Sequence, residues 1–157
     1  MNYIIREMKK DEYALLEDFL YEAIFIPDGV KPPPRSVIDS PELQVYIAGF
    51  GSSEHDRAVV AEIGGAIAGA AWVRIMDDYG HVDNDTPSLA ISVYPEYRGM
   101  GIGTKLLERL LISLKECGYL KVSLSVQREN YAVKMYKKAG FRILAETEEE
   151  YIMEVKL

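Results

Sequence analysis

The stretch that decides the fold is Tyr94-Pro95-Glu96-Tyr97-Arg98-Gly99-Met100-Gly101-Ile102-Gly103-Thr104, where glycines stand directly before a long amphipathic segment. Glycine lets the main chain approach a ligand closely, and the first turn of a helix offers unpaired amides and partial positive charge. The stretch therefore predicts a site for an anion such as a phosphate, with a tight structural turn as the alternative. It is not a Walker P-loop, and Thr104 stands where a dinucleotide fingerprint needs glycine or alanine.

The residues around the glycines predict alternating strands and helices. A strand over 89–93 stops at Pro95, and an apolar stripe predicts a helix from Gly101 to Cys117. Further strands are predicted over 2–6, 57–63, 66–76, 120–126, 141–145 and 150–156, and further helices over 10–23, 42–49 and 130–139. Prolines 32–34 exclude regular structure from the loop over 27–41. The order predicts one α/β domain with a mixed sheet.

Length and composition are those of a single globular domain. The chain has 157 residues, of which 48% are apolar and 27% charged, and no apolar run approaches the ~20 residues of a membrane span. Its one cysteine, Cys117, rules out an internal disulfide framework and is expected to be a buried thiol. With only His55 and His81 beside it, a metal site is not expected. The N-terminal residues lack a secretory signal, so a cytoplasmic protein is expected.

The charge is unevenly distributed along the chain. The net charge of −7 argues against a general nucleic-acid binder, which must neutralise phosphates. Residues 1–96 carry a net charge of −10, residues 97–142 carry +7 and residues 143–157 carry −4. The glycine-rich stretch thus begins the basic part of an acidic chain. Either this part meets a small anionic ligand, or it is a basic surface that balances acidic neighbours.

Two motifs resemble those of a known family. Arg98-Gly99-Met100-Gly101-Ile102-Gly103 matches the Arg/Gln-x-x-Gly-x-Gly/Ala signature of the GCN5-related N-acetyltransferase (GNAT) superfamily. Downstream, the segment 130–141 resembles a second family motif, with Asn130, Ala132, Tyr136 and Gly140-Phe141 in the family's order. The resemblance covers nearly the whole chain, although the N-terminal third matches only in outline.

The resemblance implies a fold with an acceptor side and a cofactor-binding core. It implies a single GNAT-like domain over 1–157, of class α/β (α+β), with a mixed, mostly antiparallel central sheet of about seven strands flanked by about four helices. Within it, residues 1–56 would form the acceptor side and residues 57–157 the acetyl-CoA-binding core.

The resemblance also implies which residues hold acetyl-CoA. Amides from Met100 to Thr104 would hold the pyrophosphate, and Arg98 would shape the loop. The main chain at Ser92 and Val93 would pair with the pantetheine arm, and the Val93 amide would polarise the thioester carbonyl. The full implied set is Ser92, Val93, Arg98, Gly99, Met100, Gly101, Ile102, Gly103, Thr104, Asn130 and Tyr136.

Two proton transfers need catalytic residues. Tyr136 is the implied acid, because a phenol of pKa ~10 suits a departing thiolate whose acid has a pKa of ~8.5. The alternative is that Tyr136 is a core residue of its helix. The amine must also lose a proton, and His81, in the acidic loop over 77–85, has the most suitable intrinsic pKa. Glu62 and a water-mediated route are further alternatives for accepting this proton. The alternative for the loop over 77–85 is a solvated turn without a catalytic role.

The resemblance thus predicts an acetyl-CoA-dependent N-acetyltransferase, in which a primary amine attacks the thioester directly in a ternary complex. The alternative is a non-catalytic CoA-binding or regulatory module with the same fold. The acceptor stays unnamed, but the acidic parts of the chain favour a cationic one, and the loop over 27–41 is expected to form a wall of its site. The family allows a homodimer. Neither a nucleic acid nor a membrane is expected as a partner, and no metal is expected as a cofactor.

Overall fold

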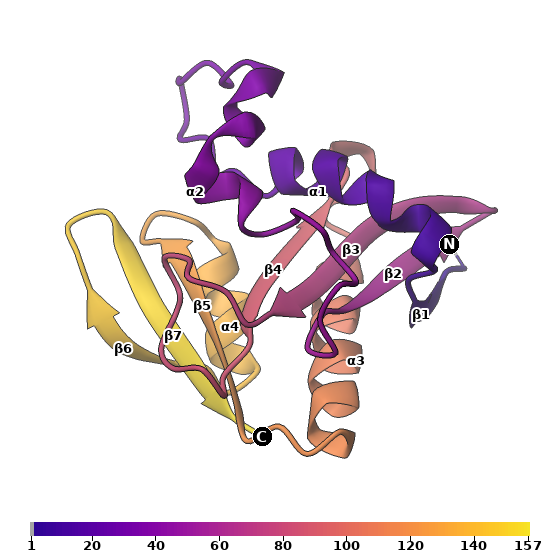
Figure 1. Cartoon of the computed structure of the whole chain (residues 1–157). Helices are drawn as coiled ribbons and strands as arrows, with labels where there is room; N and C mark the ends of the chain where they lie inside the picture. The colour runs from indigo at the N-terminus through magenta and orange to yellow at the C-terminus, as the bar shows by residue number, and fades with distance from the viewer. Residues whose placement is uncertain (1) are drawn as a thin grey trace.

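The computed structural model describes residues 2–157 as a seven-stranded sheet with helices on both faces (Figure 1). The sheet order is β1-β2-β3-β4-β5-β7-β6. Its strands are β1 (Ile4–Glu7), β2 (Arg57–Ile63), β3 (Ala66–Arg74), β4 (Ser88–Val93), β5 (Lys121–Gln127), β6 (Arg142–Glu146) and β7 (Glu150–Lys156). The α-helices are α1 (Leu16–Glu22), α2 (Pro41–Gln44), α3 (Ile102–Glu116) and α4 (Ala132–Lys138). The predicted fold class is confirmed.

The N-terminal helices are shorter than predicted. The helix predicted over 10–23 divides into a 3-10 helix, Lys10–Leu15, and α1, while the one predicted over 42–49 ends at Gln44 and continues as turns. A further 3-10 helix, Arg35–Asp39, lies inside the loop predicted to be irregular. Proline explains its start, because Pro34 has no amide to donate and can stand directly before a helical turn.

The sheet opens in its middle, between β4 and β5. These strands are the parallel neighbours of the sheet, and they share one registered pair, Ser88 with Ser123. By contrast, β3 and β4 pair antiparallel from Arg74 with Ser88 to Gly69 with Val93. Beyond Ser88 the strands β4 and β5 diverge (Figure 1). This divergence leaves one side of β4 without a neighbouring strand, and a cleft forms there.

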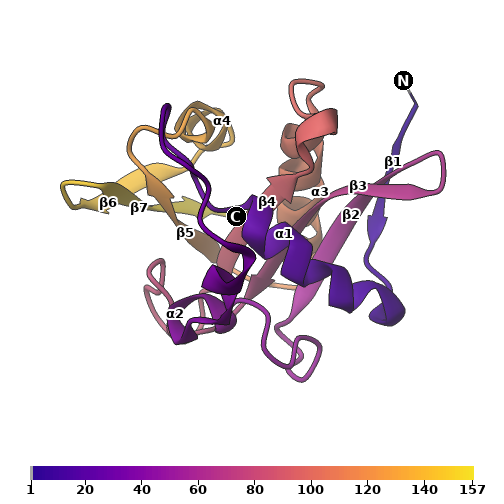
Figure 2. The same cartoon turned by 90° about the horizontal axis from the view of Figure 1, so that it is seen from above.

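The helices cover the two faces of the sheet, with α1 and α2 on one face and α3 and α4 on the other (Figure 2). The apolar stripe of α3 is buried on its face, at Leu106, Leu107, Leu110 and Leu114. Gly69 permits this close packing, because a Cβ there would lie 2.9 Å from the Ser92 carbonyl oxygen and 3.2 Å from Leu106 Cδ1. The opposite face buries α1 residues and Trp72 in a second core.

Buried polar contacts of β3 hold the segment after α2 against the sheet. Trp72 Nε1 donates to the Tyr46 carbonyl oxygen at 3.0 Å. Arg74 donates to the carbonyl oxygens of Val45 at 3.2 Å and Ala48 at 2.8 Å, and it pairs with the buried Asp56 carboxylate at 3.1 Å. These bonds set the position of Tyr46, whose side chain reaches the cleft.

One expectation about the α3 helix is wrong. Cys117 was expected to be buried below the leucine stripe, but it is exposed. It stands at the C-cap, where the chain turns away from the sheet at Gly118, whose φ is +91°. Among residues 2–157, no helix is both long and apolar enough to span a membrane.

Candidate functional site

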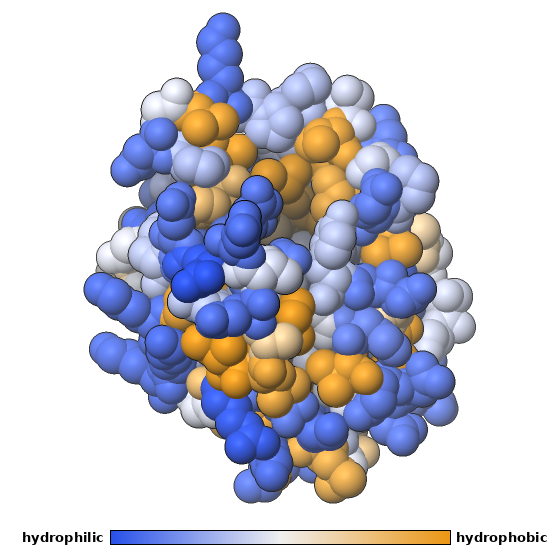
Figure 3. All heavy atoms as spheres, turned by 90° about the vertical axis from the view of Figure 1, so that its left-hand side faces the viewer, coloured by the Kyte–Doolittle hydropathy of each residue, from blue (hydrophilic) through white to orange (hydrophobic). Residues whose placement is uncertain are grey.

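The divergence of β4 and β5 forms a cleft of about 1110 Å³. Its walls come from the end of α1, from β4, from the glycine segment and α3, from the end of β5, from α4 and from the turn between β6 and β7. Figure 3 shows the hollow on this face, with hydrophobic surface inside it and hydrophilic atoms on its rim. Since typical small-molecule sites measure about 300–1,000 Å³, the cleft has room for a large ligand.

The cleft wall contains all the predicted acetyl-CoA residues except Met100. Those in the wall are Ser92, Val93, Arg98, Gly99, Gly101, Ile102, Gly103, Thr104, Asn130 and Tyr136. Met100 is 36% exposed and contributes nothing to the wall. The two motifs, about 30 residues apart in sequence, thus meet across one cavity.

The glycine segment presents open amides at the start of α3. Helical hydrogen bonding begins when the Lys105 amide donates to the Gly101 carbonyl oxygen at 3.2 Å, so the first-turn amides of residues 102–104 have no acceptor within the helix. Gly101 is the N-cap with φ +78°, and no side chain caps it. A Cβ on Gly99 or Gly101 would meet nothing within 4 Å, so the space beside the turn is open. Residues 102–104 all line the cleft, where an anion can approach their amides.

The hydrogen-bond alternation of β4 decides which of its amides reach the cleft. The Tyr94 amide donates to the Ala68 carbonyl oxygen of β3 at 2.9 Å. Antiparallel partners alternate, so the main chain of Ser92 also pairs with β3, whereas the amides of Ile91 and Val93 point toward the gap left by β5. The geometry thus supports the predicted role of the Val93 amide. It does not support pairing of a ligand with the Ser92 main chain.

Arg98 ties the glycine segment to β4 and α1. Its Nε donates to the Val93 carbonyl oxygen at 2.8 Å, and Nη2 lies 3.4 Å from the Glu22 carbonyl oxygen and 3.5 Å from the Glu22 carboxylate. Among residues 2–157, it is the one cationic side chain in the cleft wall. The other basic residues of the segment over 97–142 lie outside the wall, including Lys105, which pairs with Glu108 at 3.4 Å.

Helix α4 supplies Tyr136, and the turn before it supplies Asn130. The Asn130 carboxamide oxygen accepts the amide of Ala132, the first residue of α4, at 2.9 Å. Tyr136 is 7% exposed and packs edge-to-face on Phe141, with ring centroids 5.6 Å apart. Burial raises the pKa of the Tyr136 phenol above its ordinary value. Tyr136 therefore keeps its proton at neutral pH, and it is both a core residue and part of the cleft wall.

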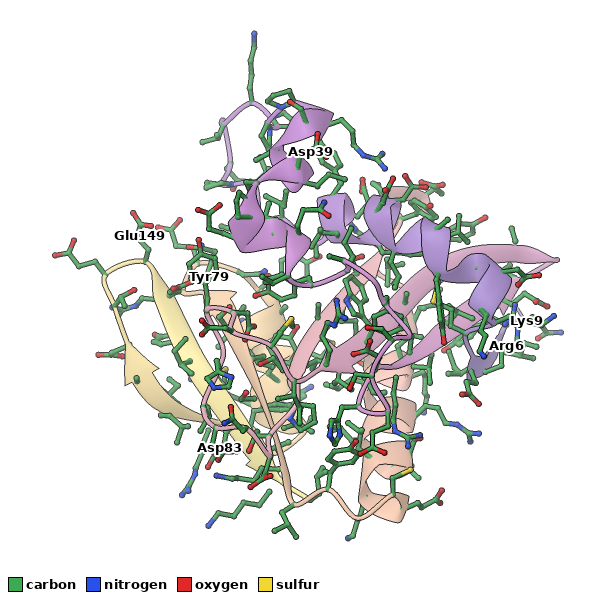
Figure 4. The ribbon with its side chains drawn as sticks, in the orientation of Figure 1. Arg6, Lys9, Asp39, Tyr79, Asp83 and Glu149 are labelled. Atoms are coloured by element: carbon green, nitrogen blue, oxygen red, sulfur yellow. The ribbon has the colours of Figure 1, made fainter. Side chains whose placement is uncertain are left out.

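The predicted proton acceptors His81 and Glu62 lie outside the cleft wall. Glu62 pairs with Arg6 at 3.0 Å, between β1 and β2. Figure 4 shows Arg6 far from Tyr79 and Glu149, which do line the cleft. His81 follows Gly80, which packs so closely on β5 that a Cβ there would lie 2.9 Å from the Leu124 carbonyl carbon. The geometry supports neither residue as the group that deprotonates an amine.

The sequence predicted an acidic acceptor side, but no motif singled out the glutamates that line the cleft. These are Glu148 and Glu149, in the turn between β6 and β7, and Glu150, the first residue of β7. Burial raises the pKa of Glu150, and the charge of Glu149 raises it further. The run of three glutamates that leads into the last strand was a visible signal in the sequence. Tyr46 is 9% exposed and also lines the cleft, but no sequence motif marks it.

Throughout residues 2–157, no group of three or more His, Cys, Asp or Glu side chains is arranged to hold a metal ion. The polar groups that line the cleft are amides, hydroxyls, phenols, carboxylates and the Arg98 guanidinium. These groups suit an anionic ligand at the α3 end and proton transfer at Tyr136 and Glu150.

Comparison with known proteins identifies the family. The family model described as "Acetyltransferase (GNAT) family" matches residues 19–141. The chain therefore belongs to the GNAT acetyltransferase family, as the two motifs predicted. Over its full length, the fold matches a crystal structure of PaiA N-acetyltransferase from Thermoplasma acidophilum in complex with coenzyme A, with a TM-score of 0.72, 22% identity and 100% of each chain covered.

Two curated relatives are similar over part of their length. A mycothiol acetyltransferase of Propionibacterium freudenreichii is 27% identical over 88 residues, which are 55% of this chain and 28% of the relative. An L-amino acid N-acyltransferase of Escherichia coli is 29% identical over 93 residues, which are 56% of this chain and 51% of the relative. The matched region thus spans about half or less of these relatives.

Proposed function

We propose that this chain is an acetyl-CoA-dependent N-acetyltransferase that acts on a primary amine. The observation that carries the proposal is one cleft with open α3 amides at one end and a buried, protonated Tyr136 in its wall. Membership of the GNAT family supports it. The coenzyme A bound to the Thermoplasma protein of the same fold is consistent with this cofactor.

The proposed acetyl-CoA site uses main-chain donors. The first-turn amides of residues 102–104 bind the pyrophosphate, because they lack helical acceptors and lie at the positive end of the helix dipole. The Val93 amide faces the gap and donates to the thioester carbonyl oxygen, where negative charge develops during attack. Asn130 binds the pantetheine arm from the start of α4. The division into an acceptor side, 1–56, and a cofactor core, 57–157, is part of this proposal.

The proposed chemistry needs one acid and one base from the chain. The amine nitrogen attacks the carbonyl carbon, and the carbon–sulfur bond then breaks. Tyr136 donates its proton to the departing sulfur. Glu150 accepts the proton that the amine loses, because its raised pKa makes it a stronger base than an ordinary glutamate. The products are the acetylated amine and free CoA thiol.

Thermal shift and thiol release test the proposal together. Saturation with CoA at about 100 times Kd is expected to stabilise the fold by about 2.7 kcal/mol. Acetyl-CoA with a panel of primary amines is expected to release CoA thiol above the rate seen without an amine. A shift without release from any amine indicates the non-catalytic module. The absence of a shift at millimolar CoA contradicts both functions.

A further inference from the structure

The half of the cleft away from α3 lacks a cation for a substrate carboxylate. Its charged side chains are Glu148, Glu149 and Glu150, with Glu22 near the glycine segment. Arg98, the one cation of the described wall, is held by the Val93 carbonyl oxygen and by Glu22. A carboxylate brought here would find no cationic partner and would lie beside like charges. Such like-charge contacts disfavour its binding.

The same half of the cleft has an extensive apolar wall. It is built by the segment that follows α1, by α2 and by two tyrosines, at Ile24, Phe25, Ile26, Leu43, Tyr46 and Tyr79. Ile24 and Leu43 also pack against the core that contains Tyr46. Figure 4 shows Tyr79 and Glu149 at the same end of the sheet, from the loop before β4 and from the β6–β7 turn. An apolar wall and a carboxylate rim thus face one space.

Tyr136 shows where the reacting atoms would lie in this space. The residue is 7% exposed and lines the cleft, and its hydroxyl is not among the buried polar atoms that lack a partner. Because Tyr136 is the proposed proton donor to the departing sulfur, the thioester lies beside it. The acceptor therefore places its amine between Tyr136 and the glutamates, with the rest of the molecule on the apolar wall.

We infer that the acceptor is a hydrophobic primary amine without a carboxylate, such as an arylalkylamine. Its ammonium group lies at the glutamates of the β6–β7 turn, and its carbon skeleton packs on the apolar wall. Amino acids are disfavoured because their carboxylate has no partner, and polyamines because the wall desolvates their further ammonium groups. This inference rests on the proposed acetyltransferase function and names its substrate class.

Matched substrates test the inference in the wild-type chain. Thiol release is measured with phenethylamine, phenylalaninamide, phenylalanine and spermidine. Each kcat/KM is calculated from the concentration of the unprotonated amine. Phenethylamine is expected to exceed phenylalanine at least tenfold, with phenylalaninamide much closer to phenethylamine. Equal or higher kcat/KM for phenylalanine or spermidine overturns the inference but leaves the acetyltransferase function intact. Thiol release from none of the amines contradicts the function itself.

A charge reversal tests the role of the glutamates. Glu149→Lys places a cation on the rim, so the kcat/KM ratio of phenethylamine to phenylalanine is expected to fall at least threefold. Glu146→Lys is the matched control, because Glu146 is exposed on β6 and lies outside the cleft wall, and its ratio is expected to stay unchanged. CoA thermal shifts verify that both variants are folded. An unchanged ratio in Glu149→Lys overturns the charge argument.

Discussion

Arg98 and Val93 are joined by a hydrogen bond of 2.8 Å from the guanidinium Nε to the carbonyl oxygen. The bond fastens the glycine segment to the last residue of β4, while the Val93 amide, on the same side of the strand, remains open to the cleft. The same guanidinium, the cationic group of the wall, also lies 3.5 Å from the Glu22 carboxylate. One contact therefore positions two proposed donors, the Val93 amide and the α3 first turn, and leaves the acceptor half acidic.

Replacement of Gly101 is expected to weaken CoA binding. Gly101→Ala costs about 1–2 kcal/mol of stability because φ is +78°, and its Cβ enters space that the proposed pyrophosphate needs. CoA affinity measured by calorimetry is expected to fall at least tenfold. Gly118→Ala is the control, since Gly118 has φ +91°, equally free space and a place at the other end of α3. Equal CoA affinities of the two variants contradict the proposed site.

Removal of the Tyr136 hydroxyl is expected to slow the chemistry and leave cofactor binding intact. Tyr136→Phe retains the buried ring, so its thermal stability and CoA affinity are expected to stay near those of the wild type. Loss of the acid is expected to lower kcat about 100-fold or more. Tyr119→Phe, which removes a 2.6 Å contact with His55 outside the cleft, is expected to retain wild-type kcat. Full activity of Tyr136→Phe limits Tyr136 to packing.

The Arg6–Glu12 pair is expected to make stability depend on pH. Arg6 lowers the pKa of Glu12 to about 2 through a two-point contact of 2.9 and 2.7 Å. Its stabilisation is present above the ordinary pKa near 4.5 and is lost as the pH falls toward 2. Glu12→Gln is expected to cost about 1 kcal/mol at pH 7 and little near pH 2, measured by urea unfolding. The exposed Glu116→Gln serves as the control, and a cost independent of pH contradicts this assignment.

The buried Arg74–Asp56 pair is expected to matter far more than a surface pair. Arg74→Met leaves the Asp56 carboxylate and two carbonyl groups unpaired, so a loss of about 3–5 kcal/mol is expected in urea unfolding. Lys105→Met, which breaks the exposed pair with Glu108, is expected to cost less than about 1 kcal/mol. Arg74→Met combined with Asp56→Asn is expected to recover part of the loss. Similar costs of the two single variants contradict the assigned role.

Strong local patterns made much of the fold predictable. The leucine stripe of α3 predicted the helix and its buried face, and the glycines at 99 and 101 predicted an open turn before it. The N-terminal helices were predicted less well, because the boundary between 3-10 and α-helix at Leu15 and Leu16 has no marker as strong as a proline or glycine. There, packing against the sheet outweighs local propensity.

The proton acceptor shows where sequence reasoning fails. His81 was favoured for its intrinsic pKa, a property of the residue type, but its loop packs on β5 and leaves it outside the wall. Glu150 reaches the cleft because β7 pairs with β5, with Glu150 opposite Gln127 at the end of that strand. The pairing joins residues distant in sequence, so periodicity could not predict it.

The sequence by itself determined the family, the order of the elements and the anion-binding turn, because these depend on local spacing, glycine geometry and two linear motifs. Tertiary structure alone decided the gap between β4 and β5 and the direction of the Val93 amide. It also decided the hydrogen bond between Arg98 and Val93 and the position of Glu150 in the cleft wall. These features depend on strand register and on contacts between distant segments. The charge and shape of the acceptor half, and therefore the substrate class, follow from that second group.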